Sequence, residues 1–327
     1  MNKIRLMDGV IDFSGSEIVC KTFADGATVD QLSGDALPYE VQEIIDAEKP
    51  DAFMKFMEGN FPNNDTLQTA LYFLSLIPAM ETDIKYCGVF YGGYATGKTA
   101  TVEIMRKVLP GYIENIPGEC IFRRNLAQSY FPDIKGKGAG VVTEVMHNKP
   151  IYTPLVKTIT GGDTITTRAL YQTPKTYVPT AQLIICTNKV IDFGKNDEAM
   201  DARLLVIPFL QKHERGHPQT KTFSEIFSKL QGEFPGIIRM LIEYYIRLRD
   251  THKGVIPQSD ECLKHKKRFI KMTEEIFLRC DVCGSFIPKD GGFIEKGRCC
   301  PYCGGVIAKA GAELADEAMR NDPPEGE

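Results

Sequence analysis

The sequence predicts an α/β fold built on a buried, largely parallel β-sheet, with an N-terminal helical region, C-terminal helices and a small metal-binding module. Short apolar runs alternate with helical segments along the middle of the chain, which is typical of parallel sheets with helices on both faces. A glycine-rich segment, GGYATGKT at residues 92–99, follows the first of these runs. Five of the ten cysteines lie within residues 280–303, and this clustering indicates a metal site.

Length and composition indicate a soluble globular protein of two or three domains. The chain has 327 residues, of which 43% are hydrophobic and 25% are charged, and these values exclude a largely disordered or collagen-like chain. The formal net charge of −4 excludes a protein that coats nucleic acid with its whole surface, so a nucleic-acid contact should be local. The N-terminus lacks a signal-peptide core, and the most apolar run, residues 71–80, is too short to span a bilayer. We therefore expect a cytoplasmic protein without membrane contact.

Changes in the hydrophobic pattern divide the chain into five parts. Runs typical of strands lie at residues 86–91, 138–143, 182–187 and 204–209, and an amphipathic helix is predicted at 237–248. The predicted parts are a partly helical N-terminal region at 1–65, an α/β domain at 66–212, a helical segment at 213–275, a cysteine-rich module at 276–306 and a tail at 307–327.

Residues 92–99 match the phosphate-binding pattern G-x-x-x-x-G-K-[ST] between a predicted strand and a predicted helix. The glycines let backbone N–H groups turn toward a phosphate, and the helix N-terminus favours an anion. Lys98 would contact the β- and γ-phosphates, and the Thr99 hydroxyl would hold Mg²⁺. The alternative is a glycine-rich turn without a ligand. The candidate binding residues are Gly92, Gly93, Tyr94, Ala95, Thr96, Gly97, Lys98 and Thr99.

Two polar residues at the ends of later apolar runs complete a candidate hydrolytic site. Glu144 follows the run at 138–143 and could hold Mg²⁺ through water or polarise the attacking water. Asn188 ends the run LIICTN and could hydrogen-bond the γ-phosphate. The alternatives are a solvated strand-end carboxylate for Glu144 and a turn or helix-cap residue for Asn188.

The order of these stretches resembles superfamily 3 DNA helicases, in particular the helicase domain of phage and plasmid primase-helicases related to poxviral ones. The matching stretches are GGYATGKT at 92–99, GVVTE at 140–144, KTITGGDTITTRALYQTPKTYVPTAQLIICTN at 157–188, DEAMDARLLVIPF at 197–209 and EFPGIIRMLIEYYIRL at 233–248. The resemblance covers roughly residues 66–250, so residues 66–212 would form the AAA+-like ATPase and helicase domain.

The resemblance implies a homo-hexameric ring that hydrolyses ATP with Mg²⁺ and moves on single-stranded DNA in a central channel. Lys98, Glu144 and Asn188 would be catalytic, and Arg203 would be an arginine finger that reaches the nucleotide of the adjacent subunit; the alternative for Arg203 is a surface charge before a buried strand. Relatives often carry two adjacent basic residues there, whereas this chain has Ala202 before Arg203. No primase activity is expected because the chain has no room for a primase domain, which leaves a primase or polymerase as a candidate partner.

A β-hairpin is predicted where the runs 164–171 and 176–185 flank QTPK at 172–175. In the family that the chain resembles, this hairpin projects into the channel and holds the DNA backbone. Four basic residues and one acidic residue give residues 149–175 a local charge of +3, which favours DNA in an otherwise acidic protein. Tyr171 could stack on a base or pack within the hairpin. The candidate DNA-binding residues are Lys157, Arg168, Tyr171 and Lys175.

The cysteine-rich module has the spacing of a zinc ribbon. Two Cys-x2-Cys pairs, Cys280 with Cys283 and Cys300 with Cys303, are separated by 16 residues. Four thiolates would close a tetrahedral Zn²⁺ site, so the zinc would be structural. Cys299 is a spare cysteine, since its use in place of Cys300 would break the spacing. Zinc ribbons bind DNA or protein, and the sequence does not distinguish the two.

These features favour an ATP-dependent, ring-forming DNA helicase for the replication of a phage, plasmid or other mobile element, in the cytoplasm of a bacterial or phage-infected cell. The alternative is a DNA-associated AAA+ ATPase that loads or remodels replication proteins without unwinding. A third hypothesis is a non-enzymatic zinc-ribbon adaptor whose ATP site controls assembly.

Overall fold

The core of the protein is a five-stranded parallel sheet. The computed structural model describes residues 2–25, 35–84, 86–122, 131–143, 145, 151–167, 175–193, 197–213, 223–280, 286–288 and 307–308. The strand order is β10-β4-β9-β6-β5, and all four pairings are parallel. The strands are β4 (Cys87–Tyr91), β5 (Ile113–Asn115), β6 (Ala139–Val142), β9 (Gln182–Thr187) and β10 (Leu204–Pro208). The predicted α/β fold is confirmed, and the predicted strand runs fall on β4, β6, β9 and β10.

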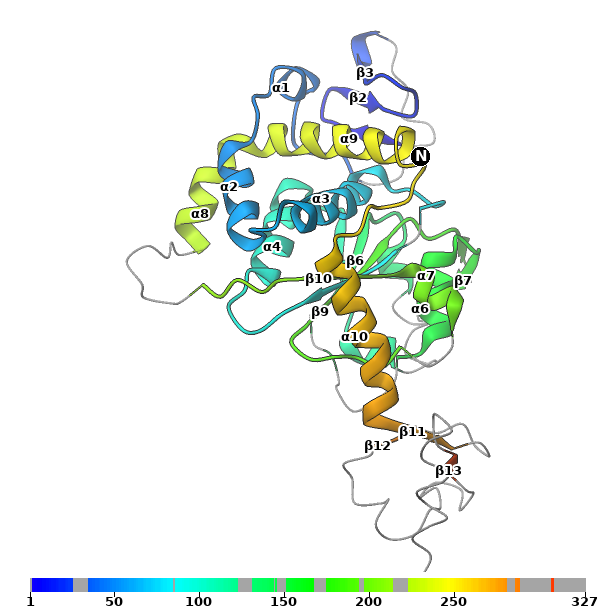
Figure 1. Ribbon diagram of the computed structural model, residues 1–327. Coiled ribbons are helices and arrows are strands. Elements are labelled where there is room, and N and C mark those ends of the chain that lie inside the picture. The colour runs from blue at the N-terminus through cyan, green and yellow to red at the C-terminus, as the bar shows by residue number, and fades with distance from the viewer. Residues whose placement is uncertain are drawn as a thin grey trace, which may run out of the picture.

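Helices cover both faces of this sheet (Figure 1). Successive strand residues point to opposite faces, and Phe90 and Val89 of β4 belong to different hydrophobic clusters. The cluster with Phe90 includes residues of α3, α4 and α9, and the cluster with Val89 includes residues of α6, α7 and α10. The bounds of these helices are α3 (Asn64–Ala79), α4 (Lys98–Val108), α6 (Thr153–Gly161), α7 (Glu198–Arg203), α9 (Phe234–Asp250) and α10 (Asp260–Ile276).

The N-terminal region contains a small antiparallel sheet and two helices. Its strands pair in the order β1-β2-β3. The elements are β1 (Lys3–Arg5), β2 (Gly9–Asp12), β3 (Val19–Thr22), the 3-10 turn Phe23–Asp25, α1 (Val41–Ile45) and α2 (Asp51–Asn60). Figure 1 shows α9 between the N-terminal sheet and α3, so α9 joins this sheet to the central domain.

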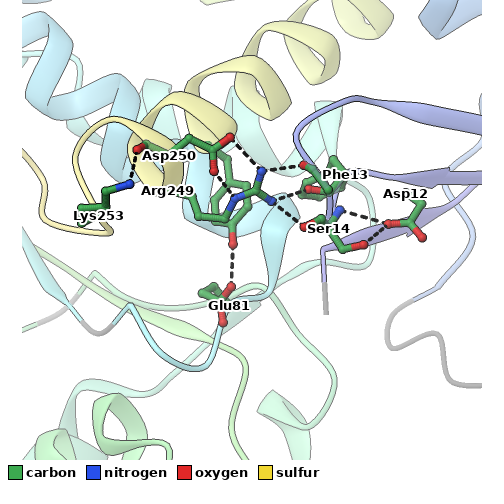
Figure 2. Close-up of polar contacts among 9 residues, drawn as sticks. Asp12, Phe13, Ser14, Glu81, Arg249, Asp250 and Lys253 are labelled. Atoms are coloured by element: carbon green, nitrogen blue, oxygen red, sulfur yellow. Dashed lines mark hydrogen bonds and ion pairs between the residues drawn. The ribbon is translucent and has the colours of Figure 1, made fainter.

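Arg249, near the end of α9, holds the turn after β2 (Figure 2). Its guanidinium donates hydrogen bonds to the carbonyl oxygens of Phe13, Ser14 and Gly15, at 2.7, 3.0 and 2.5 Å, and forms an ion pair with Asp250. A planar fork of five N–H donors suits several acceptors at once. The N-terminal sheet is thus fixed to α9 by polar contacts in addition to apolar packing.

The remaining elements lie between and after these. Three-residue and four-residue 3-10 turns occur at Gly118–Ile121, Phe131–Ile134 and Gln231–Glu233, and α8 (Phe223–Leu230) precedes α9. The strands β11 (Phe277–Cys280), β12 (Phe286–Pro288) and β13 (Ile307–Ala308) form an antiparallel sheet after α10. None of the helices within the described ranges has the length and apolar character needed to cross a membrane.

Helix α10 packs directly against the end of β4. The ring of Phe269 lies edge-on to the ring of Tyr91 at 5.1 Å between centroids, and the His265 ring lies 5.5 Å from the same tyrosine. Phe269 is buried, and Cys262 near the start of the helix is buried as well. The helix therefore connects the end of β4 to β11, which follows it without an intervening residue.

The predicted hairpin is confirmed in its paired strands and wrong in its second boundary. β7 (Ile165–Thr167) pairs with β8 (Lys175–Tyr177) in antiparallel register, so Lys175 lies in a strand and not in the turn. The predicted run 176–185 is not one strand, because β8 ends before Pro179 and β9 belongs to the central sheet. Proline has no N–H for a ladder hydrogen bond, which accounts for the break.

We predict that Tyr245→Phe destabilises the fold in a pH-dependent way. The Tyr245 hydroxyl donates to Glu81 at 2.5 Å. Burial alone would raise the pKa of Glu81, but hydrogen bonds from Tyr245 and from the backbone N–H groups of Asp83 and Thr82 outweigh it, so this pKa lies below its ordinary value. The stabilisation from a lowered carboxyl pKa is present above the unfolded value of about 4.3 and disappears as pH falls through the folded value.

The variant should therefore lose on the order of 1 kcal/mol of unfolding free energy near pH 7, and the difference from wild type should shrink below about pH 4. Denaturant unfolding across pH measures both quantities. Tyr244→Phe is the matched control, because its ring contact with Tyr72 is kept. An equal loss at pH 7 and at low pH would show that the hydroxyl does not act through Glu81.

Candidate active site

The glycine-rich loop at residues 92–99 connects β4 to α4 at the carboxyl edge of the sheet. The N–H of Gly92 donates to the carbonyl of Thr187 at 3.1 Å, which fixes the start of the loop against β9. A Cβ on Gly92 would lie 2.1 Å from the carbonyl oxygen of Phe209, so this position has room only for glycine. Gly97 has φ +90° and caps α4, a conformation that favours glycine. Local backbone geometry thus requires glycine at both positions of the motif.

The Lys98 ammonium lies within the loop. Its Nζ donates to the carbonyl oxygens of Gly92 and Gly93, at 2.8 and 2.6 Å, and to Oγ1 of Thr96 at 3.1 Å. Burial lowers the pKa of Lys98 from its ordinary value. All three acceptors are neutral, and a phosphate oxygen would offer a stronger, charge-assisted hydrogen bond. Thr99 is the second residue of α4 and is exposed beside it.

Asn188 directly follows β9, next to this loop. Tyr91 of β4 is paired with Thr187 of β9, so the residues that follow each strand emerge side by side. The Thr187 side chain is buried and exchanges hydrogen bonds with the backbone of Lys189, whereas Asn188 is exposed. The side chain of Asn188 is therefore held at the same edge as Lys98 by a tight turn.

The segment around the expected acid also ends at this edge. Val142, the last residue of β6, pairs with Ile185 of β9, and Thr143 follows it. Glu144 lies outside the described residues. Thr143 therefore lies at the edge of the sheet that carries the loop.

Arg203 lies at the opposite edge of the sheet. It is the last residue of α7, and β10 begins at the next residue, paired with Cys87 at the start of β4. The five residues of β10, at about 3.3 Å each, separate the two edges by roughly 16 Å. Arg203 Nη1 donates to the carbonyl of Ala199, and its buried Nε has no partner among the described residues. Arg203 is thus not brought together with Lys98 and Asn188 of its own chain.

The expected DNA-binding residues differ in their surroundings. Lys157 of α6 forms an ion pair with Asp197, the N-cap of α7, and its hydrogen bond lowers the pKa of that carboxyl. Lys175 lies in β8, and the hairpin is reinforced by a contact of 3.2 Å between the hydroxyls of Thr166 and Thr176. Because the hairpin precedes β9, it lies at the amino edge of the sheet with Arg203. Arg168 and Tyr171 lie outside the described residues.

In and directly after the cysteine-rich module, the structure describes the strands β11, β12 and β13. Cys280 ends β11, which pairs with β12 and β13 in antiparallel register. Cys283, Cys299, Cys300 and Cys303 lie outside the described residues. No group of three or more potential metal ligands occurs in the part of the chain that is described. Of the other cysteines, Cys20 is half-buried, and Cys87, Cys120, Cys186 and Cys262 are buried and free.

The sequence interpretation missed two residues that contact the loop. Asn60, the last residue of α2, lies against Gly97, and His213, after β10, donates its backbone N–H to the carbonyl of Ala95 at 2.8 Å. Asn60 precedes a polar loop, FPNND, and His213 follows a strand by several residues. Neither position carries a periodicity or spacing that could have identified it.

Comparisons with known proteins support a relationship to helicases. No family model matches the chain. It is 27% identical over 236 residues to "Putative helicase L207/L206" of Acanthamoeba polyphaga mimivirus, a match that covers 66% of this chain and spans 24% of the length of that protein. The C-terminal region (305–718) of NrS-1 in its apo form has a similar fold, with a TM-score of 0.55 and 13% identity over 83% of this chain and 72% of that one. A second apo form of that region gives a TM-score of 0.54 and 15% identity, over 83% and 71% of the two chains.

We predict that the loop tolerates alanine at Gly93 but not at Gly92. A Cβ at Gly92 would meet the Phe209 carbonyl, whereas a Cβ at Gly93 has nothing within 4 Å. Gly92→Ala should weaken nucleotide binding at least tenfold and lower the melting temperature, and Gly93→Ala should change both little. Calorimetric titration with ATP and thermal unfolding measure the two effects. Equal behaviour of the two variants would contradict the packing of the loop on Phe209.

Proposed function

We propose that the chain is the motor part of an ATP-dependent DNA helicase that moves on single-stranded DNA, for the replication of a phage, plasmid or other mobile element. One observation carries this proposal: the phosphate loop and Asn188 lie at one edge of the sheet, and Arg203 and the hairpin lie at the other. A site divided in this way would be complete only between two subunits. The helicase name of the mimivirus relative supports the reaction class. Because this chain spans about a quarter of that relative, the activity of a longer protein is part of the proposal.

The residues at the carboxyl edge would bind and hydrolyse the nucleotide. ATP with Mg²⁺ would supply the phosphoanhydride bond whose cleavage drives movement. Lys98 would exchange its carbonyl acceptors for the β- and γ-phosphates, and Thr99 would hold the metal ion. Glu144 would accept a proton from the attacking water or orient it, and Asn188 would hydrogen-bond the water or the γ-phosphate. The accessible positions of Thr99 and Asn188 are what this role requires.

Arg203 would act on the nucleotide of a neighbouring subunit in a homo-hexameric ring. A side chain at the amino edge cannot reach the loop of its own chain across the length of β10. An arginine supplied in trans can stabilise transition-state charge by on the order of 10³-fold or more in rate. Closed cyclic symmetry provides one such contact at each interface.

The hairpin would hold DNA at the amino edge. Lys175 is the first candidate for this contact, because it is the first residue of strand β8 of the hairpin. A lysine would contact phosphate without base preference, as movement along any sequence requires. Lys157, Arg168 and Tyr171 remain candidates, although Lys157 would have to leave Asp197 before it could bind DNA. A primase or polymerase is the expected type of protein partner.

The cysteine-rich module would hold one structural Zn²⁺ through Cys280, Cys283, Cys300 and Cys303. The pairing of β11 with β12 supports this, because the strands flank the segment with Cys283. We predict about one zinc per chain by elemental analysis, and the loss of this zinc in Cys280→Ser. A chain without zinc as purified under metal-replete conditions would contradict the ribbon.

We predict that Lys98→Ala and Arg203→Ala are each inactive alone and partly active when mixed. In a random one-to-one mixture, about one quarter of the interfaces would combine an intact loop with an intact Arg203. ATP turnover should therefore recover only after subunit exchange, which is measured by energy transfer between labelled subunits. The double variant is the control, because neither single variant should recover with it. Exchange without recovered turnover would show that Arg203 does not act in trans.

We predict that Lys175→Ala uncouples ATP turnover from DNA. The variant should keep its basal ATPase rate and lose DNA stimulation and strand displacement on a forked duplex. The salt dependence of its single-strand affinity should become shallower by about 0.7 for each phosphate that the variant no longer neutralises. Lys21→Ala, a lysine on the N-terminal strand β3, is the matched control. Wild type that hydrolyses ATP but displaces no strand would favour a loading or remodelling ATPase instead.

A further inference from the structure

Asn60 makes an unusually close contact with the phosphate loop. Its side chain is buried, with 1% of the residue exposed, at the end of α2. A Cβ on Gly97 would lie 2.3 Å from Oδ1 and 3.0 Å from Nδ2 of Asn60. The carboxamide therefore lies directly against the backbone of the residue that caps α4. The N-terminal region thus contributes a wall of the candidate active site.

His213 fixes the orientation of that carboxamide. Its Nε2 lies 2.8 Å from Oδ1 of Asn60 and is the donor, because a carboxamide oxygen only accepts. The backbone N–H of the same histidine donates to the carbonyl of Ala95, which has the left-handed φ of +57°. His213, which follows β10, thus contacts both the loop and the side chain of Asn60.

His213 and Asn60 both lie on segments that further hydrogen bonds hold in place. The chain after β10 follows the loop, since the N–H of Phe209 donates to the carbonyl of Tyr91 at 2.6 Å. The other end of α2 is held by the Glu233 carboxylate, which accepts from the N–H groups of Ala52 and Phe53 at 2.8 and 2.9 Å. Asn60 therefore stands at the end of a helix that is fixed at its start.

We propose that Asn60 and His213 are positioning residues of the nucleotide site, an inference that rests on the proposed function. Together they keep Ala95 and Gly97 in the backbone conformations that direct the loop N–H groups toward phosphate. Asn60 does not touch the nucleotide, because it is buried behind the loop. Nδ2 of Asn60 is buried and without a partner among the described residues, so hydrogen bonding by Nδ2 does not account for the asparagine.

The role of Asn60 can be tested by placing a charge on its side chain. An aspartate would keep the shape and the acceptor for His213, but it would place a negative charge beside the N-terminus of α4. That end of the helix is the place where bound phosphates would lie, and like charges repel there. The penalty should therefore grow with the number of phosphates on the ligand, which a purely structural defect would not cause.

The experiment is calorimetric titration of the full chain with ATP, ADP and AMP at two salt concentrations. Asn60→Asp should weaken ATP binding at least tenfold, ADP binding less and AMP binding least, and higher salt should reduce these differences. Asn63→Asp is the matched control, because this exposed N-cap accepts the N–H of Thr66 and aspartate caps equally well. Its affinities should equal those of wild type.

A second pair of variants tests the histidine. His213→Gln keeps a side-chain N–H for Asn60, so its KM for ATP should stay close to that of wild type. His213→Ala removes this N–H and should raise the KM for ATP severalfold. This pair decides the matter if Asn60→Asp does not fold. An equal loss for ATP, ADP and AMP, or no loss, would overturn the role of Asn60, and equal effects of His213→Gln and His213→Ala would overturn that of His213. Wild type that binds no nucleotide would instead overturn the proposed function, and this inference with it.

Discussion

The parallel pairing of β4 between β9 and β10 is the constraint on which the rest of the structure depends. It brings the glycine-rich loop and Asn188 to one edge and sends the start of β10 to the other. Strand β4 also packs closely against helix α3. A Cβ on Gly88 in β4 would lie 2.3 Å from the ring of Phe73 in α3. The lack of a side chain at Gly88 therefore allows α3 to approach the strand that carries the loop.

Much of the fold could be predicted because its signals are local. The strand–glycine loop–helix unit around Lys98 and the buried runs of β6, β9 and β10 need only neighbouring residues to be recognised. The second hairpin boundary could not be predicted in the same way, because residues typical of strands continue from Thr176 into β9. Only the pairing of β8 with β7, and the break at Pro179, divide that run into two strands.

The contacts around the candidate site could not be predicted because they join distant parts of the chain. The hydrogen bond between His213 and Asn60 spans 153 residues, and those from the start of α2 to the Glu233 carboxylate span 180 and 181. A count of charges gives Lys157 the same weight as Lys175, but only the structure pairs Lys157 with Asp197. Sequence thus identifies the groups that a ligand would touch, and tertiary structure identifies the groups that hold them.

Helix α10 links the end of β4 to the cysteine-rich module. Through His265 and Phe269 in its middle part it packs against Tyr91, immediately before the glycine-rich loop, and at its end it continues into β11. The part of the helix beyond this contact, from Phe269 to Ile276, is roughly 10 Å long at about 1.5 Å per residue. A rotation of the helix about Tyr91 would therefore move its far end together with the start of β11. The shape of the chain couples the strand beneath the loop to the beginning of the cysteine-rich module.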